Sequence, residues 1–464
     1  MTNKKTRITA RLCIFFILTL ICGCIMSCRS YTFSYKEKET AGVLASYTPV
    51  YPETAFAVFS DPHIYDVSLG TEGPDFQKYL DNDRKMLVQS EEILLEAIDI
   101  VKNSNADFLI VPGDITKDGE ASSHRLFRAH ITELENSGIP VYVVPGNHDI
   151  SNPHAVRFSK SGHERVETIA PDEFSTLYGE YGYNEALARD PSSLSYIAEP
   201  VEGLWILALD SAYYEDNYEE DYPQTGGRFL QEEIDWIELM LQKAVEKNKA
   251  VIAMMHHGIL EHYDSQKKYF GEYVVENYKA VSEMLARYKV RLCFTGHYHA
   301  QDITMKRWNE KTFIYDVETG SLVTYPCPIR FVKFDGTGNA EISSQLITSI
   351  PSYTAKGEDF FEFAKSYVYA GIEKIAIQTM VDLNMKKKEA EKLSGQIADA
   401  FVAHYAGDEV FTGDTMISTE GLSFMGRLVV GNRKALVHGL WQDKAPADNH
   451  IRINLNTGVW KEKE

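Results

Sequence analysis

Histidine, carboxylate and amide side chains occur along this chain in short clusters whose donors could bind metal ions. In chain order the clusters are Asp61-Pro62-His63, Gly113-Asp114, Gly146-Asn147-His148-Asp149, Met255-His256-His257-Gly258 and Gly296-His297-Tyr298-His299. Imidazole suits Zn, Fe, Cu and Ni, whereas a cage of oxygen ligands alone would indicate Mg, Ca or Mn. The mixed donors suffice for two adjacent metal ions, which together clamp phosphoryl oxygens and activate water. The clusters therefore indicate the chemistry of a binuclear hydrolase.

Most of the clusters follow a short apolar run, which predicts that a buried strand ends just before them. The predicted strands are residues 56–59, 108–111, 141–144, 205–209, 251–255 and 291–294. Side chains two residues apart on an extended segment point the same way, so Asp61 and His63 can reach one ion together. His297 and His299 have the same spacing and can serve one ion each. Gly113 allows the backbone to turn close to the metals.

Amphipathic stretches between these runs complete the predicted layout. Residues 89–103 and 231–247 have apolar side chains at helical spacing, and their alternation with strands is typical of layered α/β packing. We expect a catalytic domain over residues 54–345, closed by a β-meander at 313–316 and 330–334. Residues 151–193 are expected to form a structured cap insertion. The C-terminal residues 346–464 are expected to be an α+β accessory region, with two helices over 360–406 and short strands over 424–460.

The N-terminus has the composition of a secretion signal. A basic segment over residues 4–11 leads into an apolar run over residues 12–21, which is too short to span a bilayer comfortably. The residues around Cys24 resemble a bacterial lipoprotein cleavage site, although Cys22 stands where a small or aliphatic residue is usual. Cys28 is a second candidate for lipidation.

We therefore expect a signal peptide over residues 1–23 and a tether over residues 24–53. The protein would be extracytoplasmic and anchored by lipid to a bacterial membrane at Cys24 or Cys28. An ordinary signal peptide with incidental cysteines is the alternative. Only Cys293 and Cys327 lie in the body of the chain, so at most one disulfide could form there.

The overall charge limits the kinds of partner. With 464 residues and a formal net charge of −20, the chain is long enough for a large domain and has an acidic surface. A nucleic acid polymer is not expected as a partner, because phosphate backbones bind positive surfaces. A small phosphoester remains compatible with this charge, since a bound metal inverts the local field. The sequence does not indicate an oligomeric state.

The ordered series Asp-x-His, Gly-Asp, Gly-Asn-His-Asp, His and Gly-His-x-His resembles the calcineurin-like metallophosphoesterase superfamily over residues 54–335. The resemblance implies a four-layer α/β/β/α sandwich and two divalent or mixed-valence ions, with Mn, Fe or Zn expected. The implied ligands of one ion are Asp61, His63 and His299. Those of the other are Asn147, His256 and His297. By the same resemblance Asp114 bridges the ions, and His148 protonates the leaving oxygen or stabilises phosphoryl charge. A bridging metal-bound hydroxide would attack phosphorus.

Two positions leave alternatives open. The family usually takes its ligand from the first residue of the fourth block, which favours His256 over His257. Many relatives carry an Asp three residues after the bridging Asp, where it orients the catalytic histidine, but Lys117 stands there in this chain. Asp118 or Asp149 is therefore a candidate to orient His148.

Several other residues are expected to have structural roles. Asp210 and Ser211 follow a predicted strand and are expected to cap it. The remaining histidines have no assigned ligand role; His154, His163 and His262 are expected at the surface, and His404, His438 and His450 lie outside the resemblance without ligand-like spacing.

The compact Gly-Asn-His-Asp block resembles those of cyclic-nucleotide and glycerophosphodiester phosphodiesterases, which favours a phosphodiester substrate. A phosphomonoesterase or nucleotidase would use the same metal site and is the first alternative. A surface lipoprotein that binds a partner without catalysis is the second, and the full set of metal donors argues against it.

Overall fold

Two seven-stranded sheets form the centre of the computed structural model, which describes residues 31–463 apart from 408, 414 and 415. In spatial order the first sheet contains β16 (Val459–Glu462), β15 (His450–Asn454), β14 (Asn339–Leu346), β13 (Pro328–Asp335), β1 (Glu53–Val58), β2 (Phe108–Pro112) and β3 (Val141–Val144). The second contains β11 (Asp302–Asn309), β12 (Thr312–Glu318), β10 (Leu292–Thr295), β9 (Ala250–Met255), β8 (Leu204–Leu209), β7 (Tyr196–Val201) and β6 (Ala188–Arg189).

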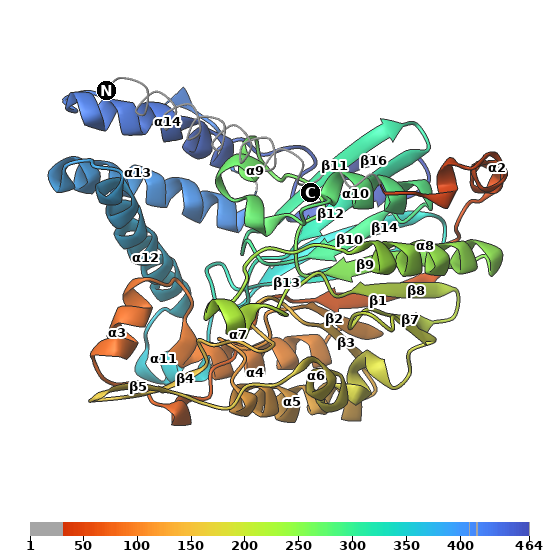
Figure 1. Ribbon diagram of the computed structural model, residues 1–464, viewed down its shortest axis with the longest axis horizontal. Helices are drawn as coiled ribbons and strands as arrows, with labels where there is room; N and C mark the ends of the chain where they lie inside the picture. Colours follow the sequence, from red (N-terminus) through yellow and green to blue (C-terminus); the bar gives the residue numbers. More distant parts are fainter. Residues whose placement is uncertain (1–30, 408, 414–415, 464) are drawn as a thin grey trace, which may run out of the picture.

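The two sheets face each other and are covered by helices on their outer sides (Figure 1). Phe56 of β1 meets Phe294 of β10 edge-on between them, with ring centroids 5.4 Å apart. The first sheet is covered by α4 (Ser90–Lys102) and α5 (Ala121–Asn136), and the second by α8 (Gln231–Glu246) and α10 (Tyr278–Arg287). The predicted four-layer α/β/β/α sandwich is confirmed. Strands such as β2 and β9 are buried along their whole length, as their continuous apolar sequences require.

The predicted β-meander is wrong. β12 lies in the second sheet, parallel to β10, whereas β13 lies in the first sheet, antiparallel to β1. The chain therefore crosses from one sheet to the other between the two strands. A turn in the sequence marks where a strand ends but not which sheet receives the next one.

Residues 151–193 contain a β-hairpin and a short helical segment. The hairpin pairs β4 (Val156–Ser159) with β5 (Gly162–Arg165) and contacts α3 (Pro74–Asp81). The helix α6 (Pro171–Leu177) and the turn Gly179–Tyr183 pack their aromatic rings near α5, away from the hairpin. Within the insertion, the pocket described below is bordered by the hairpin and by Pro153 and His154 just before it.

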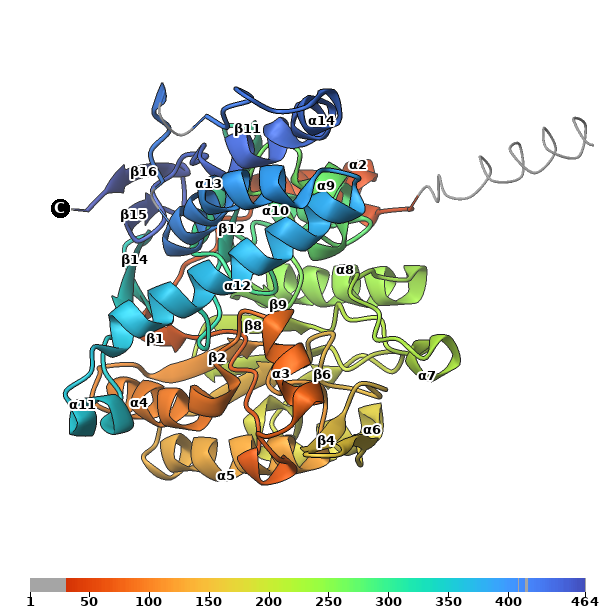
Figure 2. The same cartoon turned by 90° about the vertical axis from the view of Figure 1, so that its left-hand side faces the viewer.

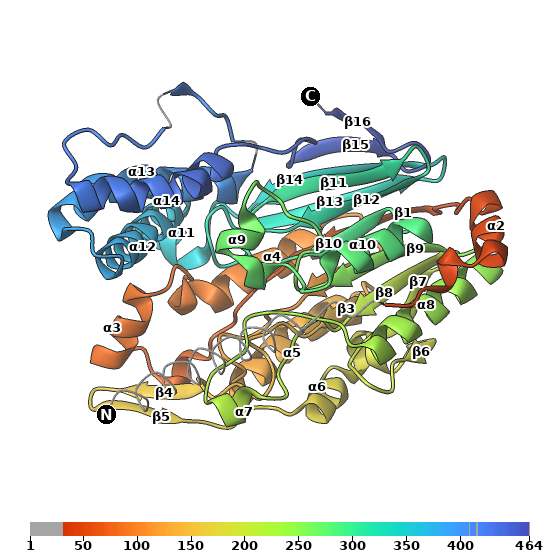
Figure 3. The same ribbon diagram turned by 45° about the horizontal axis from the view of Figure 1, so that its top comes forward.

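The C-terminal region adds a layer of long helices and two further strands (Figure 3). The two helices predicted over residues 360–406 are confirmed as α12 (Phe360–Asp382) and α13 (Lys387–Ala406). The strands predicted from residue 424 onward are wrong up to residue 440, because α14 (Phe424–Leu440) occupies this stretch and packs on α13. β15 and β16 follow, and β15 pairs antiparallel with β14, so the end of the chain extends the first sheet.

The predicted signal peptide, Cys24 and Cys28 lie outside the described residues, and so does the first part of the segment predicted as a tether. From residue 31 onward this segment packs on the catalytic domain. The helix α2 (Lys38–Ser46) and the buried rings of Phe33 and Tyr35 lie in the same apolar cluster as α8. Within the described part of the chain, no helix is both long and apolar enough to cross a membrane.

Candidate metal centre

The residues predicted to bind metal converge where parallel strands of the two sheets end. They follow β1, β2 and β3 in the first sheet and β9 and β10 in the second. The carboxyl ends of parallel strands share one edge, where α/β proteins place their ligands. None of the predicted ligands is more than 5% exposed; they are Asp61, His63, Asp114, Asn147, His256, His297 and His299. The polar cluster is therefore buried as a group and needs internal compensation.

One set of donors consists of Asp61, His63 and His299. The Nε2 atoms of the two histidines are 3.2 Å apart, and His299 Nε2 is 3.4 Å from Asp61 Oδ1. His63 Nδ1 lies 3.2 Å from the carbonyl oxygen of Thr116, which can accept the ring proton and leave Nε2 as a free donor to a metal. Two facing imidazole nitrogens beside a carboxylate form an arrangement that a cation would satisfy.

The second set consists of Asp114, Asn147, His256 and His297. Asp114 Oδ2 is 3.2 Å from His256 Nε2 and 3.6 Å from His63 Nε2, so this oxygen lies between the two sets. Asn147 Oδ1 is 3.1 Å from His256 Nε2. His297 shares a potential metal site with Asp114 and His256, and its buried Nε2 has no hydrogen-bond partner among the described residues. The donor chemistry fits a second ion that shares Asp114.

The choice between His256 and His257 follows from their hydrogen bonds. His256 places Nδ1 3.0 Å from the carbonyl oxygen of Pro112, which turns Nε2 towards Asp114. Both ring nitrogens of His257 have other partners, because Nδ1 is 2.9 Å from Ser211 Oγ and Nε2 is 3.0 Å from the carbonyl oxygen of Thr225. The geometry thus favours His256 as a metal ligand.

The backbone at the cluster is strained. Asp61, His63, Asp114, His297 and His299 all have positive φ angles, between 37° and 75°. Residues with a Cβ atom rarely adopt this region, and each such residue costs roughly 1–3 kcal/mol. The surrounding structure therefore holds the donors in orientations that an unconstrained chain would not adopt. The sequence motifs gave no sign of this strain.

Electrostatic effects at the cluster depend on burial and on Asp114. Burial lowers the pKa of His63, His297 and His299, so these rings are neutral and able to bind a cation. Burial also opposes a charge on His256, but Asp114 outweighs it and raises the pKa of His256 to about 9. A metal ion would displace this proton, so metal binding at this ligand releases a proton.

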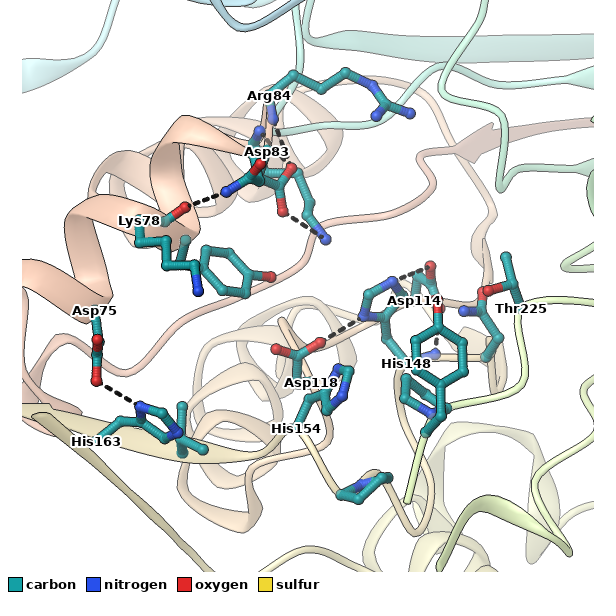
Figure 4. A pocket seen from close by; sticks show the side chains of 18 of the residues that line it. Asp75, Lys78, Asp83, Arg84, Asp114, Asp118, His148, His154, His163 and Thr225 are labelled. Atoms are coloured by element: carbon teal, nitrogen blue, oxygen red, sulfur yellow. Dashed lines mark hydrogen bonds and ion pairs between the residues drawn. The ribbon is translucent and has the colours of Figure 1, made fainter. Parts of the chain in front are cut away.

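His148 lies at the edge of the cluster and is paired with Asp118 (Figure 4). Its Nδ1 is 2.8 Å from Asp118 Oδ1, and its Nε2 is 4.0 Å from Asp114 Oδ2. Burial and Lys85 lower the pKa of His148, but Asp114 and Asp118 outweigh them and raise it. Lys117 forms ion pairs with the second oxygen of Asp118 and with Glu120, so it fixes the carboxylate instead of replacing it.

Asp149, the other candidate to orient His148, has a different role. Its two oxygens accept hydrogen bonds from the backbone nitrogens of Ile115, Thr116 and Gly146, at 2.8–3.0 Å. The side chain thereby ties the loop after β2 to the loop after β3. Asp118 is the residue that contacts His148.

A pocket of about 760 Å³ opens above the cluster. Its walls come from α3, the β4–β5 hairpin and the residues that follow α3, including the basic Lys78, Arg84 and Lys85. The helix α12 contacts α3, and Lys374 binds Asp81 at 2.7 Å, so the C-terminal helices support this wall. No local sequence signal marks these basic residues, because Lys78 lies on a short helix and Arg84 and Lys85 in the loop after it, outside any strand or motif.

The burial of some histidines outside the cluster differs from the sequence-based prediction. His154 and His163 are exposed, as predicted, although both line the pocket. The prediction for His262 is wrong: this ring is 1% exposed and lies 2.7 Å from Asp302 and 3.2 Å from Asp316. His404 is also buried, with Nδ1 2.5 Å from Glu409 Oε1 and 4.0 Å from Asp302 Oδ2. These contacts join α13 to β11 and have no signal in local sequence.

Comparison with known proteins agrees with the geometry of the cluster. The family model described as calcineurin-like phosphoesterase matches residues 54–301. A probable glycerophosphodiester phosphodiesterase of Arcobacter nitrofigilis is 27% identical over 210 residues, which are 44% of this chain and 60% of that protein. A probable cyclic nucleotide phosphodiesterase of Synechococcus is 24% identical over 203 residues, 43% of this chain and 60% of that protein. The chain thus spans about three fifths of the length of these relatives.

Among solved structures, a dimetal phosphatase from Danio rerio aligns with a TM-score of 0.44 at 15% identity, covering 64% of this chain and 97% of that one. A purple acid phosphatase from yellow lupin aligns with a TM-score of 0.37 at 11% identity, covering 64% of this chain and 53% of that one. The family match includes every predicted metal ligand and spans more than half of the sequence. The chain therefore belongs to the calcineurin-like phosphoesterase family.

Proposed function

We propose that the protein is a binuclear metal-dependent hydrolase that cleaves phosphodiesters. The observation that carries the proposal is the convergence of the predicted ligands into two donor sets around one shared oxygen of Asp114. The matched relatives in Arcobacter and Synechococcus are both named as phosphodiesterases, which supports a diester over a monoester.

Asp61, His63 and His299 would hold one ion, Asn147, His256 and His297 the second, and Asp114 both. When bound, two such ions neutralise phosphoryl oxygens and supply a hydroxide nucleophile at neutral pH. The nitrogen-rich donor set favours Mn, Fe or Zn over an ion that prefers oxygen alone.

His148 would transfer the proton that the leaving oxygen needs. Nδ1 of His148 donates a hydrogen bond to Asp118. This bond turns Nε2 of His148 towards the pocket and supports the charged form of the ring. Lys85 lines the same pocket and is ion-paired with Asp83 at 3.3 Å.

The choice of substrate class is testable with two chromogenic esters. With Mn²⁺ added, turnover of bis-p-nitrophenyl phosphate should exceed turnover of p-nitrophenyl phosphate. A preference for the monoester would contradict the diesterase proposal and favour a phosphomonoesterase or nucleotidase on the same site.

A partner-binding lipoprotein without catalysis is the alternative from another class. Asp114→Asn and His148→Ala should each lower hydrolysis of the preferred ester by about 10²- to 10⁴-fold, because one removes a ligand and the other the proton donor. Equal rates for both variants and the wild type would refute the enzyme proposal.

We further propose that the protein is exported and anchored by lipid at Cys24 or Cys28, on the basis of the basic and apolar N-terminal sequence. Radiolabelled palmitate should enter the wild type and be lost from one of the variants Cys24→Ser and Cys28→Ser. Label in neither the wild type nor the variants would favour an ordinary signal peptide.

A further inference from the structure

An apolar cavity of about 250 Å³ lies between α12, α13 and α14, next to the metal pocket. Its walls include Ile372, Ala376, Leu393, Ile397, Val429 and Val437. A cavity lined in this way excludes water and favours an apolar ligand. At about 30 Å³ for each methylene-sized group, which is the share of one water molecule in the liquid, it has room for roughly eight such groups.

The cavity adjoins the metal pocket. Arg84 and Tyr273 line both spaces. The ring of Tyr273 lies 4.4 Å, centroid to centroid, from the ring of the predicted ligand His297. The guanidinium of Arg84 is hydrogen-bonded to Tyr273 and Tyr405, and only its buried Nε has no hydrogen-bond partner among the described residues. The wall between an anionic group at the metals and the apolar cavity is thus formed by two side chains, Arg84 and Tyr273, which an apolar chain has to displace to enter the cavity.

The other end of the cavity reaches the surface. A shallow depression outside it shares Tyr269, Leu383 and Val429 with the cavity, together with the basic Arg433 and Lys434. Two apolar side chains that line this opening are exposed, Leu428 at 48% and Met425 at 41%. An apolar rim with basic neighbours suits the entry of a molecule that has both an apolar chain and an anionic group.

We propose that the substrate is an amphiphilic phosphoester, in which one ester substituent carries an alkyl or acyl chain of about eight carbons or more. The phosphoryl group lies in the metal pocket and the chain occupies the cavity beneath α12, which runs from α11 (Pro351–Lys356) towards α13 and α14 (Figure 2). This assignment rests on the proposed function and names the class of substrate for it.

The direct experiment is a series of alkyl p-nitrophenyl phosphodiesters, from methyl to dodecyl, assayed below their micellar concentrations. Burial of one methylene improves binding about fourfold. We expect kcat/KM to rise by more than 100-fold from methyl to octyl and then to level off once the cavity is full. The same kcat/KM for the methyl and octyl esters would overturn the proposal.

Two variants fill the cavity from different helices. Ala376→Trp on α12 and Val429→Trp on α14 should each reduce the octyl-to-methyl ratio of kcat/KM by at least tenfold. The matched control is Gln378→Trp, an exposed position on α12, which should keep the wild-type ratio. Thermal melting identifies a variant that fails to fold, and the variant on the other helix then provides the test.

The experiments distinguish a failure of the proposed function from a failure of the proposed cavity ligand. If no ester is hydrolysed, the phosphodiesterase proposal fails, and calorimetry with alkylphosphonates still tests the cavity. Decylphosphonate should bind the Mn²⁺-loaded wild type at least tenfold more tightly than methylphosphonate and lose this advantage in Ala376→Trp. Equal affinities of the two phosphonates would overturn the assignment of the cavity.

Discussion

The pairing of His148 with Asp118 shows how single residues at this site depend on each other. Asp118 lies within hydrogen-bonding distance of the ring and raises its pKa. Asp118→Asn should lower kcat by about 10- to 100-fold. It should also lower the pKa of His148, so the loss of activity at alkaline pH should begin at a lower pH.

The pH–rate profile is the measurement for Asp118→Asn. Asp75→Asn is the matched control, because Asp75 binds His163 at 2.7 Å in the same pocket but does not contact the metal cluster. An unchanged alkaline limb in Asp118→Asn would show that Asp118 does not set the proton affinity of His148.

Gly296 allows a close approach of the backbone to the cluster. A Cβ atom at this position would overlap Ser60 and the carboxylate of Asp61. We expect Gly296→Ala to displace Asp61 and to reduce the metal content, measured by plasma mass spectrometry, by one ion or more. In the control Gly258→Ala the new Cβ would have its nearest neighbour at 3.5 Å, so wild-type metal content is expected. Full metal content in Gly296→Ala would contradict the assignment of Asp61.

Asp210 makes the stability of the protein depend on pH. As predicted, it has a structural role: Tyr214 Oη and the backbone nitrogens of Leu194 and Ala212 donate to it at 2.8–3.3 Å. Burial raises its pKa to about 7. Because the folded state binds this proton more tightly, protonated Asp210 stabilises the folded protein fully at pH values below its unfolded-state pKa of about 3.9. This contribution is lost as the pH rises to about 7.

Between pH 5.5 and 8.5 this loss amounts to about 2 kcal/mol of unfolding free energy. Asp210→Asn should remove it, so urea unfolding of the variant should depend less on pH than that of the wild type. The same pH dependence in both proteins would show that Asp210 ionises normally in the folded state.

At the scale of secondary-structure elements, a buried ion-pair network connects the C-terminal helices to the sheets. His404, near the end of α13, contacts Glu409 and approaches Asp302 of β11, which also binds His262. His404→Ala would leave buried carboxylates without this partner, at a cost of about 3–5 kcal/mol.

Chemical denaturation should show this loss, and limited proteolysis should cut more readily between α13 and α14. His450→Ala, at an exposed position on β15, should behave like the wild type. Unchanged stability and cleavage in His404→Ala would show that the network does not hold the helices in place.

For the molecule as a whole, metal binding and folding are expected to be linked. The cluster is a small part of a large apolar core, so removal of metal by EDTA should abolish activity while the far-UV circular dichroism persists. An ion that binds only the folded state stabilises it by about 2.7 kcal/mol at 100 times its Kd. The melting temperature should fall with EDTA and recover with Mn²⁺. Full activity and an unchanged melting temperature in EDTA would contradict a functional metal site.

The chemistry of this protein was determined largely by local sequence. Asp61, His63, Asp114, His256 and His297 each closely follow an apolar run, and an apolar run of this length forms a buried strand in most surroundings. The type of side chain and its distance from the strand end were enough to predict the donors, and the order of the motifs carried the resemblance that implied the family and the sandwich.

The tertiary structure decided how these donors and the accessory elements are arranged. The choice of Asp118 over Asp149, the burial of His262 and the helix α14 all depend on partners distant in sequence or on packing against other elements. The basic wall of the pocket and the cavity beside it arise where α12 to α14 pack against α3 and α9 (Gln266–Tyr269). Periodicity and motif spacing describe neighbours along the chain, whereas these contacts follow from which surfaces meet when the chain folds.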